Sequence, residues 1–234
     1  MKQIKPIPPL AQMINVTRDF SDEQHKAIIL DNVSFAINPG ELVLLLGPSG
    51  SGKSTFLTIM AGLQPPSNGE VWLFGNELHD YSDFELQQLR AEHIGFIFQT
   101  FHLIDSLTAL ENVLLIMQFS KNKVKNKKKA AIELLNQFGI GHLANKYPKT
   151  MSQGEKQRVA IARALANKAE LLIADEPTGS LSSEQAMKIV QLLHHESKIN
   201  KRGVLIASHD QRIAQFADRI LYIQDGVVLN HTVK

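Results

Sequence analysis

Residues 47 to 55 read Gly47-Pro48-Ser49-Gly50-Ser51-Gly52-Lys53-Ser54-Thr55, which matches the pattern G-x-x-x-x-G-K-[ST]. An apolar run, Leu42–Leu46, precedes this loop, and a helical pattern follows it over residues 53–63. Glycines here let backbone N–H groups turn toward phosphate oxygens, and the start of a helix adds positive potential. We therefore predict a phosphate-binding loop, in preference to a glycine-rich turn that binds nothing. In this loop Lys53 reaches the β- and γ-phosphates of a nucleotide, Ser54 binds Mg²⁺ and Thr55 contacts the α-phosphate.

A second apolar run, residues 171–174, ends in two carboxylates, Asp175 and Glu176. At the end of a buried strand, Asp175 is placed to hold Mg²⁺ through its waters. Glu176, one residue further on, points in a different direction and is a candidate general base for an attacking water. An Asp-Glu pair after a strand often does no more than cap a helix. The presence of Lys53 upstream favours the catalytic interpretation.

The composition narrows the classes of function. The chain has 234 residues, of which 44% are apolar, enough for one sizeable domain. Its net charge of +2 gives no reason to expect nucleic acid as a partner. The absence of cysteine excludes disulfides and cysteine-ligated metals. Since no apolar run approaches the roughly 20 residues of a membrane span, and residues 1–10 lack a signal-peptide stretch, we expect the chain itself to be soluble.

Strand and helix patterns alternate along the chain. Val33, Phe35 and Ile37 alternate with polar or small residues, as on a half-buried strand. Residues 94–98, 171–174 and 204–207 read as further strands, whereas 82–165 otherwise reads mainly as helix and 183–196 as another helix. Two dipeptides, Asn68-Gly69 and Asp225-Gly226, predict hairpin turns.

Several segments resemble the motifs of ABC ATPases. Residues 151–165 begin Met-Ser-Gln-Gly-Glu and look like the signature, whose usual core is L-S-G-G-Q. Residues 94–99, ending at Gln99, resemble the Q-loop; residues 208–210, around His209, resemble the H-loop; and residues 175–181 resemble the junction of Walker B and D-loop. They occur in the order of the family and cover nearly the whole chain from Ile14.

The resemblance implies a fold and an organisation. We expect an α/β P-loop NTPase of ABC type, with a mainly parallel sheet core, an antiparallel β flank and an inserted helical subdomain. An N-terminal tail is expected over residues 1–13 and an ABC ATPase domain over 14–234, with the helical subdomain at approximately 86–160.

The resemblance also implies a homodimer. Two copies of an ABC ATPase stack head to tail with two ATP molecules between them, and the signature of one copy faces the ATP held by the other. Ser152, Gln153 and Gly154 are then ATP-binding residues. Ser152 donates to the γ-phosphate, and the backbone N–H of Gly154, near a helix N-terminus, adds to that contact.

Three further side chains receive roles from the resemblance. Gln99 senses Mg²⁺ and the attacking water, His209 bonds the γ-phosphate and orients the water relative to Glu176, and Phe20 stacks on adenine. Each has a plainer alternative. A histidine after a strand is often structural, and a phenylalanine in an N-terminal strand is often part of the core.

The segment 99–113 is expected to touch a membrane partner. In ABC transporters a groove between the catalytic core and the helical subdomain receives a short helix of the permease, and Phe101, Leu103 and Leu107 supply apolar contacts of that kind. The segment resembles the lipoprotein-releasing, macrolide-exporting and cell-division branch, whose permease transmits motion. The chain would then lie peripherally on the cytoplasmic face of the cell membrane. The alternative is that these residues only pack the helical subdomain.

Two departures from the family, Gln153 and Ser182, bear on turnover. Gln153 replaces the usual third glycine of the signature, and Ser182 stands where the D-loop has an aspartate that couples the two sites. They keep open the alternative of a nucleotide-gated regulatory scaffold with little turnover. Soluble ABC proteins of DNA repair or translation fit less well, because this chain has neither a long coiled coil nor two tandem ATPase domains. A further run of charge is either a solvated face or a contact with anionic lipid; it comprises Lys121, Lys123, Lys125, Lys127, Lys128 and Lys129.

Overall fold

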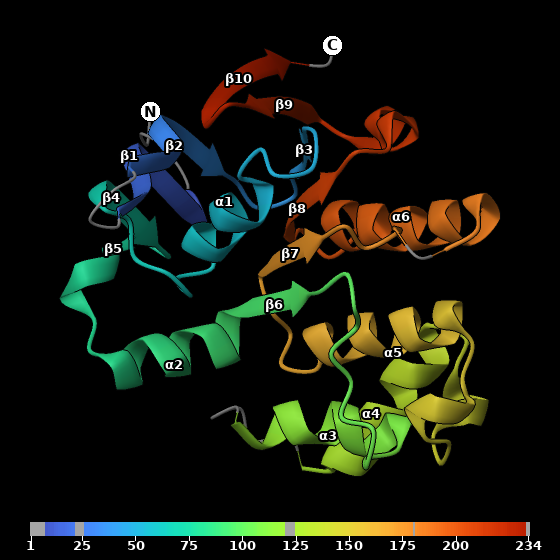
Figure 1. Ribbon diagram of the computed structural model, residues 1–234. Coiled ribbons are helices and arrows are strands. Elements are labelled where there is room, and N and C mark those ends of the chain that lie inside the picture. The colour runs from blue at the N-terminus through green and yellow to red at the C-terminus, as the bar shows by residue number, and fades with distance from the viewer. Residues whose placement is uncertain (1–7, 22–25, 120–124, 180, 233–234) are drawn as a thin grey trace, which may run out of the picture.

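The computed structural model describes residues 8–21, 26–119, 125–179 and 181–232, which form two sheets with helices around them (Figure 1). The strands are β1 (Ala11–Ser21), β2 (Lys26–Ile37), β3 (Leu42–Leu46), β4 (Asn68–Leu73), β5 (Asn76–Glu77), β6 (Ile94–Ile97), β7 (Leu171–Asp175), β8 (Gly203–Ser208), β9 (Arg219–Gln224) and β10 (Val227–Thr232). The α-helices are α1 (Lys53–Met60), α2 (Asp83–His93), α3 (Ala109–Phe119), α4 (Lys127–Gln137), α5 (Gln153–Leu165) and α6 (Ser183–Lys198). Short 3₁₀ helices are η1 (Leu78–Asp80), η2 (Gly141–Leu143), η3 (Pro148–Thr150) and η4 (Gln211–Phe216).

The central sheet has the strand order β10-β9-β3-β8-β7-β6. Its inner strands pair in parallel, and β10 pairs with β9 in the antiparallel direction. The second sheet, β2-β1-β4-β5, is antiparallel throughout the described residues. This arrangement confirms the expected α/β class with a mainly parallel core and an antiparallel flank.

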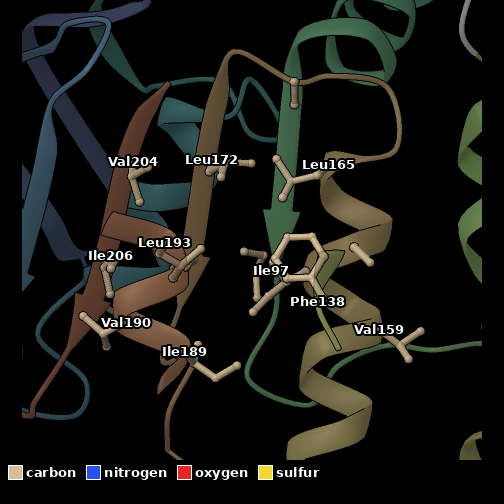
Figure 2. Packing of buried hydrophobic residues seen from close by; sticks show 14 of the residues in the cluster. Ile97, Phe138, Val159, Leu165, Leu172, Ile189, Val190, Leu193, Val204 and Ile206 are labelled. Carbon is tan, nitrogen blue, oxygen red and sulfur yellow. The ribbon is translucent and has the colours of Figure 1, made fainter. Parts of the chain in front are cut away.

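Strand β3 shows why the central sheet is apolar along its whole length. Leu42, Leu44 and Leu46 join a core with residues of α3, α5 and α6, whereas Val43 and Leu45 join a second core with α1 and the antiparallel sheet. Both faces of the strand are therefore covered, as a buried parallel strand requires. Figure 2 shows part of the first core, with strand residues Ile97, Leu172, Val204 and Ile206 beside helix residues Val159, Leu165, Ile189, Val190 and Leu193 and beside Phe138.

One of the two predicted hairpin turns is wrong. Asn68 and Gly69 lie inside β4, where the register against β1 shifts, and a Cβ on Gly69 would come within 2.4 Å of the Asn15 carbonyl oxygen. The left-handed Gly69 therefore serves a bulge between neighbouring strands. The turn between β4 and β5 is instead made by Phe74 and Gly75, both at positive φ. The second prediction is confirmed: Asp225-Gly226 joins β9 to β10 with φ 50° and 78°.

Strand β1 begins before the expected boundary at Ile14. Strand β1 starts at Ala11, and Leu10, Ala11 and Met13 are buried. The region expected to be the helical subdomain holds most of α2, the central-sheet strand β6, helices α3 and α4 and the first part of α5. Helix α2 packs against β6 and α3, and α3 and α4 pack against α5. Within the described ranges, no helix combines the length and the apolar character needed to cross a membrane.

Candidate active site

The loop from Gly47 to Gly52 leaves the buried strand β3 and leads directly into α1, as predicted. A Cβ on Gly47 would come within 2.5 Å of the Ile223 carbonyl oxygen, so this close approach excludes a larger residue. Gly50 and Gly52 have φ of 80° and 100°, the left-handed region that glycine adopts without strain. The local backbone therefore needs glycine where the motif has it.

Lys53 is buried and folds back over its own loop. Its Nζ donates hydrogen bonds to the carbonyl oxygens of Gly47 at 2.9 Å and Pro48 at 3.0 Å. The Oγ of Ser51, also buried, has no hydrogen-bond partner within the described chain. A buried hydroxyl without a partner costs free energy. A phosphate oxygen in this loop would satisfy it.

A concavity of about 250 Å³ lies beside the loop and fits part of a nucleotide. Phe20, from β1, is half exposed at its edge, and the Arg18 guanidinium lies 4.8 Å from the centre of its ring. Phe20 is thus not a core residue, in contrast to the plainer alternative. The concavity is lined by Phe20, Ile29, Gly50, Gly52, Lys53, Ser54 and Thr55.

Strand β7 delivers the two carboxylates to the edge of the sheet beside Lys53. Asp175 is its last residue, and Glu176 adopts a left-handed φ of 46°, uncommon for a residue with a side chain. Its backbone N–H donates to the Ala207 carbonyl on the neighbouring strand at 3.0 Å. The Oε1 of Glu176 lies 3.7 Å from Lys53 Nζ. Backbone strain of this kind is concentrated at functional sites.

The carboxylate of Glu176 also meets the residues that follow β8. His209 Nδ1 lies 3.1 Å from Glu176 Oε1 and 3.0 Å from Oε2, and Ser208 Oγ donates to Oε2 at 3.4 Å. Lys53, Glu176 and His209 were predicted from three separate motifs. The structure brings Lys53 and His209 together at the carboxylate of Glu176.

Gln99 follows β6 and reaches the same edge of the sheet. A Cβ on Gly179 would lie 3.4 Å from Gln99 Nε2 and 3.8 Å from Glu176 Cβ. Within the described residues, no group of three or more His, Cys, Asp or Glu side chains forms a metal cage. The predicted metal set of Ser54, Gln99 and Asp175 offers oxygen donors, the kind that Mg²⁺ binds while it keeps waters and phosphate ligands.

The signature residues lie in a different place from the phosphate-binding loop. Ser152 is the N-cap of α5. Gly154 is buried, and a Cβ added to it would lie 3.1 Å from Gln185 Nε2 of α6. Gln153 is exposed. Ser152 and Gly154 line a separate concavity of about 200 Å³. A single copy therefore does not join the signature to the Lys53 site.

The N-terminus of α5 carries a capping box. Glu155 Oε2 accepts from the backbone N–H of Ser152 at 2.7 Å and from its Oγ at 2.9 Å, and the Glu155 N–H donates to Ser152 Oγ. The hydrogen bond from the Ser152 backbone lowers the pKa of Glu155. The carboxylate is therefore charged at neutral pH.

An apolar groove of about 360 Å³ lies between the sheet edge and the helices. Its lining includes His102 but not Phe101, Leu103 or Leu107, the residues expected to contact a permease. Leu103 packs against the core, and Phe101 and Leu107 are half-buried. The backbone explains this: Arg163 of α5 donates to the carbonyl oxygens of Phe101, at 2.8 Å, and His102, which turns this segment. The lining includes Leu63, Phe96, Phe98, His102, Ile116 and Phe119.

The groove residues missed from the sequence share one signal. Phe119 is 55% exposed at the end of the apolar helix α3, and Leu63 is 49% exposed just after α1. Large apolar side chains at the ends of helices are a hint of a surface contact, but sequence alone does not show which of them meet. Of the basic run, Lys121 and Lys123 lie outside the described residues, and Lys127 donates from Nζ to the Met117 carbonyl at 2.7 Å.

Comparisons with known proteins agree with this geometry. Residues 30–179 match the family model described as ABC transporter. The chain is 40% identical to the putative hemin import ATP-binding protein HrtA of Staphylococcus haemolyticus, over 93% of this chain and 98% of that one. It is 38% identical to the lipoprotein-releasing system ATP-binding protein LolD of Pseudomonas fluorescens, over 89% and 92% of the two chains.

Solved structures of MJ0796 from Methanocaldococcus jannaschii have the same fold. One is a dimeric ABC transporter cassette, with a TM-score of 0.89 and 40% identity over 96% of this chain and 99% of that one. The other, also dimeric, is a post-hydrolysis state bound to ADP and Pi, with a TM-score of 0.89 and 39% identity over the same shares. The chain therefore belongs to the ABC transporter family, as an ATP-binding subunit that hydrolyses ATP.

Proposed function

We propose that Glu176 is the general base of ATP hydrolysis and that His209 positions it. The observation that carries this proposal is the meeting of Lys53, Glu176 and His209 at one sheet edge beside the phosphate-binding loop. In this arrangement Glu176 takes a proton from the attacking water, His209 orients the carboxylate, and Gln99 closes the site beside Gly179.

Glu176→Gln tests this assignment because it keeps the size of the side chain and removes its basicity. Turnover should fall by about 10²–10⁴-fold while ATP affinity stays within about twofold. Lys53→Ala is the matched comparison, because it should lose affinity as well. Full turnover in Glu176→Gln would refute the assignment. A parent protein that binds ATP with negligible turnover would point instead to the regulatory scaffold.

The metal and phosphate contacts follow from the same edge of the sheet. The oxygens of Ser54, Asp175 and Gln99 would hold Mg²⁺, which when bound polarises the phosphoryl oxygens. The backbone of residues 47–55 cradles the phosphates, and Phe20 stacks on adenine. Phe20→Ala should weaken ATP binding by about tenfold with little change in kcat, measured by nucleotide titration and steady-state kinetics.

The dimer completes the site. Ser152, Gln153 and Gly154 lie outside the Lys53 concavity in one copy, and a head-to-tail partner would bring its own signature to that concavity. Light scattering on the Glu176→Gln variant should show ATP-dependent dimerisation, which Lys53→Ala should abolish. A Glu176→Gln protein that stays monomeric at saturating ATP would contradict this assembly.

A separate integral-membrane permease occupies the apolar groove in this proposal, which places the chain peripherally at the cytoplasmic face of the membrane. Support comes from Phe119 and Leu63, large exposed apolar side chains at the groove, and from the LolD name, which speaks of a lipoprotein-releasing system. A photo-crosslinker at Phe119 should capture the permease. The matched control is Phe84 on α2, which is 66% exposed and does not line the groove. Equal capture at both positions would refute the placement.

A further inference from the structure

One exposed arginine joins two segments that flank the hydrolysis site. Arg212, in η4, binds the carboxylate of Asp210 in two places, with Nε 2.8 Å from Oδ1 and Nη2 2.7 Å from Oδ2. Its remaining nitrogen, Nη1, donates to Ser183 Oγ at the start of α6 at 2.9 Å. A guanidinium is a planar fork, so the bidentate contact with Asp210 fixes the direction in which Nη1 points.

The hydrogen bonds continue from Asp210 to the catalytic carboxylate. The backbone N–H of Asp210 donates to Ser208 Oγ at 3.1 Å, and Ser208 Oγ donates to Glu176 Oε2 at 3.4 Å. Residue 209, between them in the chain, is the histidine that contacts both oxygens of Glu176. The start of α6 is thus connected to Glu176 through one arginine, one aspartate and the loop after β8.

Ser182, the residue before Ser183, stands where the D-loop of the family has an aspartate. Ser182 is exposed and its side chain caps α6, accepting from the Gln185 N–H at 3.5 Å. It offers no carboxylate, whereas the neighbouring Ser183 gives this segment a side-chain link to Arg212 and so to the loop after β8. The contact with Arg212 also lowers the pKa of Asp210, which keeps the pair charged at neutral pH.

We propose that Arg212 is a positioning residue for hydrolysis, which holds the loop carrying His209 in register with the start of α6 through Asp210 and Ser183. The proposal rests on the assignment of Glu176 and His209 above. Arg212 acts through its contacts with Asp210 and Ser183. When the segment around Ser182 is held at a dimer interface, the guanidinium transmits that position to His209 and so to the Glu176 carboxylate.

Steady-state ATPase kinetics on Arg212→Gln test the proposal. The kcat should fall about tenfold, because a small displacement of a catalytic group is costly, while KM and the Kd for ATP stay within about twofold. Arg212→Lys should recover only part of kcat, since one ammonium cannot replace three directed contacts. Ser183→Ala, which removes the Nη1 acceptor alone, should lower kcat about threefold, and combining it with Arg212→Gln should cause no further loss.

Lys188→Gln is the matched control. It removes another exposed ion pair of α6, in which Lys188 Nζ lies 2.6 Å from Glu184 Oε1, and it should leave kcat unchanged. The proposal is overturned if Arg212→Gln keeps kcat within twofold, if its loss lies in KM, if Lys188→Gln loses as much, or if the effects of Arg212→Gln and Ser183→Ala multiply. Glu176→Gln separates the two claims: a wild-type rate there refutes the base assignment, whatever Arg212 does.

Discussion

Asn112 in α3 is fully buried, and its amide holds the loop that precedes the helix. Its Oδ1 accepts from the Ile104 N–H at 2.9 Å. Its Nδ2 donates toward three carbonyl oxygens, those of Ile104 at 3.2 Å, Leu107 at 3.1 Å and Thr108 at 3.0 Å. The loop therefore needs an acceptor on one side of residue 112, supplied by Oδ1, and a donor on the other, supplied by Nδ2. Two substitutions separate these requirements.

Asn112→Ala leaves the Ile104 N–H and the carbonyls without their partner. Because each unmade buried hydrogen bond costs about 1–3 kcal/mol and part of the loop reaches water, we expect a loss of about 3 kcal/mol in the free energy of unfolding. Asn112→Asp keeps the shape and the acceptor but turns a second oxygen toward the three carbonyls. Ionisation of the new carboxyl is then opposed by burial and by these oxygens, so its pKa in the folded state is raised.

The sign of the pH dependence follows from that shift. A carboxyl with a raised folded-state pKa is best tolerated below its unfolded pKa, and stability is lost as pH rises toward the folded pKa, by up to about 1.4 kcal/mol per pH unit. Urea unfolding at about pH 5 and about pH 7.5 should therefore show a penalty for Asn112→Asp that grows with pH, unlike that of Asn112→Ala. The reasoning fails if Asn112→Asp is as stable as the parent at the higher pH, or if its penalty is independent of pH.

Three further outcomes follow from contacts elsewhere. Gly95→Ala should destabilise the fold by about 2–3 kcal/mol in urea unfolding, because the new Cβ would lie 2.3 Å from the Ala164 carbonyl oxygen; a change below about 0.5 kcal/mol would contradict this. Ser182→Asp should raise the Hill coefficient of ATP hydrolysis and change turnover, and if both stay unchanged the argument that the missing D-loop aspartate weakens coupling fails. Hydrogen bonds from Ser152 lower the pKa of Glu155 in the folded state. The contribution of Glu155 to stability is therefore present above its unfolded-state pKa and is lost as pH falls through its folded-state pKa. Glu155→Gln should therefore flatten the acid side of the Tm profile, and an unchanged profile would refute the cause.

The core of the site could be predicted because its motifs are local and their chemistry is specific. The phosphate-binding loop needs glycine at particular backbone angles next to a buried strand. The sequence from 42 to 55 contains both the apolar run of the strand and the glycine pattern of the loop. The carboxylates of Asp175 and Glu176 end an apolar strand, and strands that lie parallel place such ends at one edge of a sheet. The meeting of Lys53, Glu176 and His209 follows from that topology.

Features that depend on contacts between distant segments were not predictable in the same way. Asn68-Gly69 has the composition of a hairpin turn, but whether a left-handed glycine makes a turn or a bulge depends on the neighbouring strand β1. Phe101, Leu103 and Leu107 were expected to contact a permease, but that His102 lines the apolar groove, and that Arg163, 61 residues further along the chain, donates to its carbonyl oxygen, could not be read from the segment itself. Neither effect leaves a local signature.

The capping box at Ser152 places a condition on the dimer. The Ser152 hydroxyl has one hydrogen to donate, and the structure directs it to Glu155 Oε2 at 2.9 Å. To donate to a γ-phosphate the hydroxyl must rotate away from that carboxylate, whereas the backbone bond from Ser152 to Glu155 can persist. Glu155 occupies the fifth signature position, so in the proposed dimer its negative charge would also lie near the partner's phosphates. In the proposed dimer, closure would therefore have to overcome one hydrogen bond and one like-charge contact, and both terms oppose association, so the remaining contacts to the bound phosphates must outweigh them.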